Sequence, residues 1–265
     1  MPALFVGHGS PMTMITDNPA RRALEALGPA LPRPRAVLAV TAHWETRGRT
    51  HLTAGEAPRT IHDFSGFPAE LYAIRYPAPG AAWLVERVAA LMGEQRILGD
   101  PDWGFDHGAW GVVLPLFPHA DVPLVAMSLD RALTPGQHLA LGAALAPLRD
   151  EGVLLVASGN LIHNLALWRR AAGTRPRWAE DFRARSNAAI LADDRPALVR
   201  LAAGEDESAA LAVNSGEHFL PLLYAAGARQ PGERAALFND TLDGALSMTS
   251  VLIGDPAPLR GLADV

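Results

Sequence analysis

The hydrophobic pattern is dominated by short, unbroken apolar runs rather than by alternating ones. Three of these runs, at residues 3–6, 36–42 and 153–157, are followed closely by the histidines His8, His43 and His163. Unbroken runs of this length are typical of buried parallel strands, and ligands bind beyond the carboxyl ends of such strands. A single histidine would be read as an ordinary loop residue. Three at equivalent positions predict a shared site, and imidazole is a common metal ligand.

The remaining pattern alternates strands with helices. Further strands are expected at residues 50–53, 122–129, 235–238 and 247–253. Helices are expected from Asn18-Pro19 to about 27, then at 81–92, 134–149 (with Pro147 ending it early), 161–171, 178–191 and 195–203. A last helix would be capped by Ser215, carry Glu217 and His218 in its first turn, and stop at Gly227. This order predicts one three-layer α/β/α domain over residues 1–265, with a mostly parallel or mixed central sheet.

Two stretches rich in glycine, proline and aromatic residues stand apart from this alternation. Residues 56–80 contain a His62-Asp63 pair and are too apolar for disorder, so we expect an ordered loop over the crevice. Residues 103–111 contain Asp106-His107 between tryptophans and glycines. His107 is either a core histidine held by Asp106 or a second residue of the site.

Composition narrows the class of protein. Of 265 residues, 49% are hydrophobic, which is enough for a full core, and the net charge of −5 gives no sign of a nucleic-acid surface. No apolar stretch reaches the roughly 18 residues that span a bilayer. The apolar run at the N-terminus has no basic segment before it, as a signal peptide would have. We therefore expect a cytoplasmic protein with no membrane partner.

The absence of two residue types excludes much chemistry. There is no cysteine, which rules out thiolate nucleophiles and cysteine-bound metals, and there is no lysine, which rules out Schiff-base catalysis. Serine hydrolysis is the main rival without a metal, but neither Ser10 nor Ser158 lies in a G-x-S-x-G elbow. Histidine chemistry, assisted by Zn, Fe, Cu or Ni, fits best.

Seven motifs, taken together and in order, resemble the class III (LigB-type) extradiol ring-cleavage dioxygenases, in their DOPA 4,5-dioxygenase-like branch. The resemblance covers residues 2–254, and its motifs are Gly7–Met12, Thr41–Trp44, Ile61–Pro68, Tyr76–Gly80, Gly104–Gly111, Ala157–Asn164 and Glu217–Tyr224. Residues 213–216 depart from the Thr-Pro that commonly precedes Glu-His in this branch.

The resemblance implies a non-haem Fe(II) site in which Zn(II) often replaces iron. His8, His43 and His218 match the metal-ligand positions. His163 matches an acid/base histidine that is sometimes a fourth ligand when zinc is bound, and His107 matches a second site histidine near substrate or oxygen. We expect His218 rather than Glu217 to face the metal, since neighbouring helical residues point about 100° apart.

The implied activity is opening of an aromatic 1,2-diol by O2 to a muconic semialdehyde. The expected partners are therefore a small catechol and O2. Nucleic acid is not expected as a partner, and the sequence does not decide whether the protein forms a homo-oligomer. The aromatic loop predicts a ring pocket lined by His62, Phe64, Phe67 and Tyr72. An arginine such as Arg75 could pair with a substrate carboxylate, although nothing in the sequence selects it. Two alternatives remain: a zinc-dependent hydrolase on the same histidines, and a metal or catechol binder without turnover.

Overall fold

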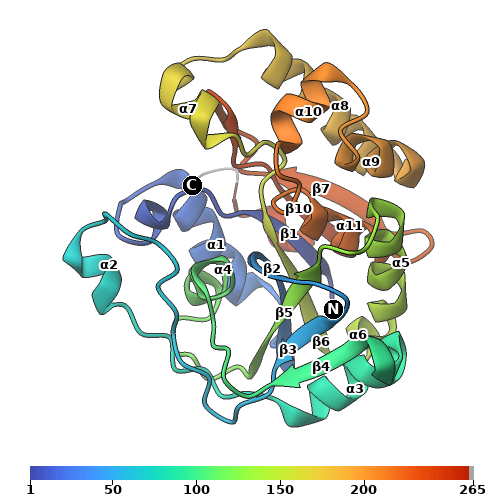
Figure 1. Ribbon diagram of the computed structural model, residues 1–265. Helices are drawn as coiled ribbons and strands as arrows, with labels where there is room; N and C mark the ends of the chain where they lie inside the picture. The colour runs from blue at the N-terminus through green and yellow to red at the C-terminus, as the bar shows by residue number, and fades with distance from the viewer. Residues whose placement is uncertain (263–265) are drawn as a thin grey trace.

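An eight-stranded mixed sheet runs through the centre of the computed structural model, which describes residues 1–262 (Figure 1). Its order is β4-β3-β5-β2-β6-β1-β10-β7, and β1, β2, β5 and β6 run parallel to one another. The strands are β1 Ala3–Gly7, β2 Ala36–Thr46, β3 Thr50–Thr53, β4 Ile97–Asp100, β5 Leu124–Asp130, β6 Val153–Gly159, β7 Arg234–Phe238 and β10 Ser250–Gly254. A separate hairpin pairs β8 Leu242–Asp243 with β9 Leu246–Ser247.

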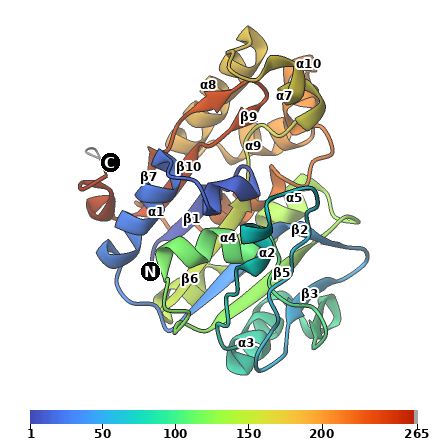
Figure 2. The same cartoon turned by 90° about the vertical axis from the view of Figure 1, so that its left-hand side faces the viewer.

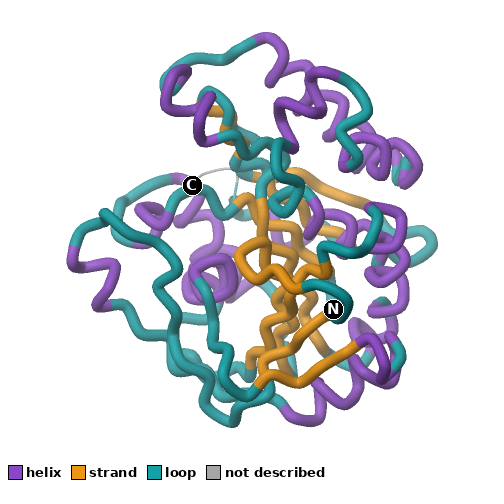
Figure 3. Tube along the Cα trace, viewed as in Figure 1, coloured by secondary structure: helices purple, strands orange, loops and turns teal. Residues whose placement is uncertain are grey.

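Helices cover both faces of the sheet, as expected for a three-layer α/β/α fold (Figures 2 and 3). One face carries α1 Pro19–Ala30 and α4 His107–Leu116, which pack on each other. The opposite face carries α3 Ala82–Met92, α5 Pro135–Leu145, α6 Pro147–Asp150 and α11 Leu220–Gly227. The other helices are α2 Ala69–Ala73, α7 Leu165–Ala171, α8 Arg177–Ala192, α9 Arg195–Ala202 and α10 Glu207–Val213, with short 3₁₀ turns at Pro11–Met14, Glu94–Arg96 and Ala257–Leu259. Within residues 1–262, no helix is long and apolar enough to cross a membrane.

Each central strand sends alternate side chains into two separate cores. In β1, Phe5 joins the cluster under α5 and α11, whereas Leu4 and Val6 join the cluster under α1 and α4. All three of these side chains are at most 1% exposed. Burial on both faces is the reason that these strands appear in the sequence as continuous rather than alternating apolar runs.

The structure corrects several predicted boundaries. Helix α1 continues through Gly28-Pro29 to Ala30, and β2 runs on to Thr46, so His43 lies inside this strand rather than beyond it. Helix α7 begins at Leu165 and not at residue 161. The pattern also missed β4, α2, α4, α10 and the β8–β9 hairpin.

The largest correction concerns residues 214–219. We expected a helix capped by Ser215, but these residues form a turn, and α11 begins only at Leu220. Asn214 and Gly216 have φ of 53° and 98°, outside the helical region. His218 is therefore placed by a turn.

Candidate metal centre

The parallel strands bring the backbones of His8 and His218 to one point of the sheet edge. Gly7 at the end of β1 pairs with Gly159 at the end of β6. The His8 N–H then donates to the Gly159 carbonyl at 3.0 Å, and the Asn160 N–H donates to the His218 carbonyl at 2.8 Å. Gly159 is required here, because a Cβ would lie 2.1 Å from that His218 oxygen.

His43 reaches the same point because β2 is irregular where the histidine lies. Val40 pairs with Met127 of β5, but the next paired residue, Glu45, is matched with Leu129. Extra residues on one strand bend it and redirect its side chains. The irregular segment is tied to the start of α4, since the Thr41 hydroxyl donates to Asp106 Oδ1 at 2.7 Å.

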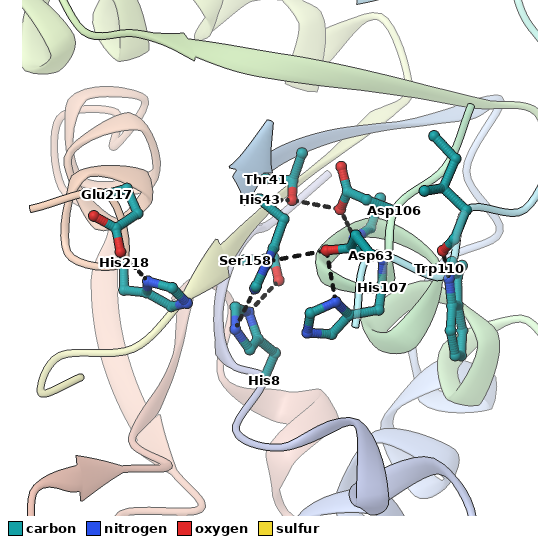
Figure 4. A network of polar contacts seen from close by, with 12 residues as sticks. His8, Thr41, His43, Asp63, Asp106, His107, Trp110, Ser158, Glu217 and His218 are labelled. Carbon is teal, nitrogen blue, oxygen red and sulfur yellow. Dashed lines mark hydrogen bonds and ion pairs between the residues drawn. The ribbon is translucent and has the colours of Figure 1, made fainter. Parts of the chain in front are cut away.

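Each of these three imidazoles is held through its Nδ1 atom by a different neighbour (Figure 4). His8 Nδ1 is 2.9 Å from Ser158 Oγ. His43 Nδ1 is 3.0 Å from Asp63 Oδ2, and His218 Nδ1 is 2.9 Å from Glu217 Oε1. Such partners fix the tautomer and orientation of metal-binding histidines and leave Nε2 as the free ligand atom.

The rings of His8, His43 and His218 have the spacing of three ligands of one metal ion. By ligand-atom distance alone, two sets lie within 4.8 Å: His8 with His43 and His107, and His218 with His163 and Glu217. The Nε2 atoms of His8 and His43 are 3.2 Å apart, and His218 Nε2 is buried without a hydrogen-bond partner in the described structure. The three ring centroids form a nearly regular triangle with sides of 5.0, 5.1 and 5.1 Å. Imidazoles that share an ion at about 2.1 Å and roughly 90–110° have centroids about 4.5–5.2 Å apart.

The same test separates two further histidines from this triad. His107 offers a nitrogen close to those of His8 and His43, but its centroid lies only 3.9 Å from that of His43. The His163 ring is stacked on His218 with a centroid distance of 3.4 Å and an interplanar angle of 9°. Because a ligand imidazole binds in its own ring plane, two parallel stacked rings do not point at one ion.

His107 is fixed by Asp63 rather than by Asp106, the partner that the sequence suggested. It is the first residue of α4, and Asp106 caps this helix by accepting from the Ala109 N–H at 3.0 Å. Asp63 Oδ1 accepts from the His107 backbone N–H, and Oδ2 accepts from its Nδ1, both at 2.8 Å. One carboxylate therefore orients both His43 and His107.

Burial keeps most of the site histidines neutral. It lowers the pKa of His8 and His218 well below the usual value, and the neighbouring histidines lower both further. Burial likewise lowers the pKa of His163 to about 4. Burial also opposes protonation of His43, but the hydrogen bond to Asp63 and the nearby carboxylates raise its pKa overall. Neutral imidazole is the form that binds metals.

A cavity of about 290 Å³ opens beside these histidines. Its lining residues are His8, Gly9, Ser10, Pro11, His43, Asp63, Phe64, Phe67, His107, His163, Leu165, Trp168, Arg169 and Leu246. Larger hollows of about 530 and 620 Å³ lie elsewhere and are lined by no histidine.

Of the four residues expected to line a ring pocket, the structure places two at the cavity. Phe64 and Phe67 line it. His62 and Tyr72 instead pack behind Phe64, with ring centroids 5.7 and 5.3 Å from it, and His62 Nε2 lies 3.1 Å from the Ile74 carbonyl. Because that polar contact turns His62 toward the backbone of its own loop, this residue supports Phe64 and does not face the cavity.

Sequence reasoning did not assign several side chains that shape the site. Asp63, Ser158 and Glu217 hold ring nitrogens, and Arg169 lines the cavity in place of Arg75, which donates to the carbonyls of Tyr72 and Ile74. The His-Asp pair in the aromatic loop was a visible signal for Asp63. Nothing local singles out Ser158 or Arg169.

The chain is similar in sequence and in fold to known proteins. Residues 2–240 match the family model described as the catalytic LigB subunit of aromatic ring-opening dioxygenase. The chain is 44% identical to the 4,5-DOPA dioxygenase extradiol of Escherichia coli K12, covering 96% of this chain and 95% of that protein. It is 35% identical to the protein of the same name from Beta vulgaris, covering 91% and 92%. A crystal structure of an uncharacterized protein from Escherichia coli K12 superposes with a TM-score of 0.81 at 39% identity, covering 96% of this chain and all of the other.

Replacement of a triad histidine should abolish metal retention. We expect His8→Ala and His218→Ala to lose bound metal after dialysis, because each removes one of the three imidazoles of the triad. Metal per chain is measured by atomic emission. His119→Ala, at an exposed position away from the site, is the matched control. Wild-type stoichiometry in both triad variants would refute the ligand assignment.

Asp63→Asn should weaken metal binding without removing a ligand. The carboxylate accepts both Nδ1–H groups at Oδ2 and the His107 backbone N–H at Oδ1, whereas an amide has one acceptor oxygen and would turn its NH2 group toward one of these donors. Loss of such outer partners typically costs roughly 10–100-fold in affinity, which competition with a chelator would measure. Asp102→Asn, at an exposed residue, should bind as the wild type does. Equal affinity in the two variants would show that Asp63 does not orient the site.

Proposed function

Because this chain belongs to the LigB family of aromatic ring-opening dioxygenases, we propose that it opens catechol-type substrates with O2 at an Fe(II) centre held by His8, His43 and His218. As a family member it is an extradiol aromatic ring-opening dioxygenase. The proposal adds the metal, its ligands, the substrate class and the product. Both oxygen atoms of O2 enter the product, a muconic acid semialdehyde, and the C–C bond beside the diol is broken.

The observation that carries the proposal is the cavity that opens beside the triangle of histidine rings, with His8 and His43 in its lining. Three imidazole ligands leave coordination positions open, which is the feature of catalytic rather than structural metal sites. A volume of about 290 Å³ holds one substituted ring. When bound, Fe(II) would supply electron transfer between the aromatic diol and O2. Zn(II) fits the same nitrogen set but lacks redox chemistry.

The aromatic walls of the cavity position the ring and exclude water. Phe64 and Phe67 pack edge-to-face on one another at 5.3 Å, and Trp168 and Leu246 come from the distant α7 and β9 segments. An apolar cleft with a few polar groups at its buried end holds a planar aromatic diol in one orientation. Holding the ring in this way contributes to the rate through proximity.

His163 is the residue we assign to proton transfer. It lines the cavity, is half-buried, and is neutral near pH 7, so its ring nitrogen can accept a proton from a catechol hydroxyl and return it later. Its stacking on His218 supports a role in proton transfer beside the proposed ligand. His107, whose Nδ1–H donates to Asp63, also lines the cavity, where its Nε2 can accept a hydrogen bond.

The names of the relatives make L-DOPA the first substrate to test. Protein reconstituted anaerobically with Fe(II) should consume one O2 per catechol when air is admitted and form a yellow ring-fission product. Oxygen-independent ester or amide cleavage by the Zn(II) form would instead identify a hydrolase. Binding of catechols without turnover by either form would identify a binding protein.

His163→Ala should keep the metal and lose turnover. General acid–base catalysis by one side chain typically contributes about 10²–10⁴-fold, so kcat should fall by that order while metal per chain stays at the wild-type value. His51→Ala, at a histidine outside the cavity, is the control. A wild-type rate in His163→Ala would remove its proton-transfer role. Loss of metal would make it a ligand.

A further inference from the structure

The cavity has an uneven distribution of charge. Apart from the histidines, the ionisable residues that line it are Asp63 and Arg169. The Asp63 carboxylate is already occupied by protein contacts, because both of its oxygens accept hydrogen bonds from His107 and one also contacts His43. Arg169 is exposed, and within residues 1–262 its guanidinium is joined to no carboxylate by an ion pair. The free charge of the cavity is therefore positive.

Arg169 is an exposed residue of the cavity lining, whereas the triad residue His8 lines the cavity as a buried residue, 8% exposed. Arg169 therefore marks the mouth of the cavity and His8 its inner end. A catechol that places its two hydroxyls at the triad must direct a substituent on the far side of its ring toward the mouth. The substituent is therefore the part of the substrate that meets Arg169.

The helix that carries Arg169 is fixed to the rest of the site. The adjacent Trp168 donates from Nε1 to Asp243 Oδ2 at 2.9 Å, and Asp243 Oδ1 accepts from the Gly173 N–H at 2.6 Å. The Asn164 N–H, at the start of α7, donates to the Ala245 carbonyl at 3.1 Å. These contacts fix the helix backbone that carries Arg169, and they occupy Asp243, a carboxylate on the segment that packs against this helix.

We propose that Arg169 binds a carboxylate on the substrate side chain and makes this enzyme selective for catechols with an anionic substituent. The inference rests on the proposed function and adds a specificity residue to it. Arginine suits the role because its planar guanidinium pairs with a carboxylate through two parallel hydrogen bonds. The cavity lining offers no free carboxylate for an ammonium group, so catechols with only an amine are disfavoured.

Three catechols that differ in the charge of one substituent test the proposal. These are 3-(3,4-dihydroxyphenyl)propionate, 4-methylcatechol and dopamine, which carry a negative, neutral and positive substituent. Arg169→Gln should lower kcat/KM for the propionate about tenfold, with 4-methylcatechol changed less than twofold. Arg170→Gln, one position along α7 and absent from the lining, should match the wild type for all three. Arg169→Glu should reverse the order so that dopamine is preferred over the propionate.

A binding measurement keeps the test independent of turnover. Calorimetric titration of the Zn(II)-loaded protein should show tighter binding of the propionate than of 4-methylcatechol, with this advantage lost in Arg169→Gln and kept in Arg170→Gln. If the advantage survives in Arg169→Gln, or is absent from the wild type, Arg169 is not the carboxylate site. Failure of the Fe(II) form to open any of the catechols would overturn the proposed function, while the titration would still decide the role of Arg169.

Discussion

The site depends on how three imidazoles, two of them buried and that of His43 half-buried, satisfy their two ring nitrogens. A buried nitrogen without a hydrogen-bond partner destabilises the folded state by about 1–3 kcal/mol. In each ring of the triad, Nδ1 is within hydrogen-bond distance of a neighbouring side chain. The second nitrogen, Nε2, has no protein partner outside the group of histidines. Two of these Nε2 atoms are 3.2 Å apart, and the third, on His218, has no partner within residues 1–262. A cation with open coordination positions satisfies all three at once, which a hydrogen-bond network of neutral rings cannot do.

The positions of these imidazoles depend on the positions of the backbone segments that carry them. Gly159 and Asn160 form adjacent hydrogen bonds to His8 and His218, so the end of one strand sets the spacing of two ligands that are far apart in sequence. The strand itself is fixed by burial on both faces, and well-packed interiors resist small shifts. His43 adds the third ring through an irregularity in β2. The well-packed core therefore keeps the edge of the sheet, and the histidines on it, in fixed positions.

Local patterns were enough for the parts of the fold that rest on buried strands. The apolar runs predicted β1, β2 and β6, and the histidines near their ends, because burial on both faces leaves a direct mark on the sequence. The pattern failed where placement depends on distant contacts. Residues 214–219 form a turn although their composition suits a helix, since the backbone of His218 is held by Asn160. Helix α4 was missed because glycines and Pro115 obscure it, although Asp106 is a good capping residue.

The side chains that hold the imidazoles were also not predictable from local sequence patterns. Asp63 stood out beside His62, yet only the fold reveals that Asp63 serves His43 and His107 while His62 turns away. Side-chain pairing across 20 or 44 residues has no periodic signature in one sequence. The resemblance to a family indicated which histidines match the ligand positions, but it did not indicate which side chains hold these histidines.

The two walls of the cavity differ from its floor in how they are built. The histidine rings come from the end of β1, from the irregular part of β2 and from the turn before α11, and those of His8 and His218 are buried. The walls come from a loop near Phe64 and from the short helix α7, whose last turn is exposed. A side chain at an exposed helix position can change without a cavity or strain in the core, whereas a change on the floor disturbs several hydrogen bonds together. Metal binding and substrate preference are therefore separable in this fold: the sheet edge maintains the chemistry, while residues such as Arg169 can vary to suit the substituent on the ring.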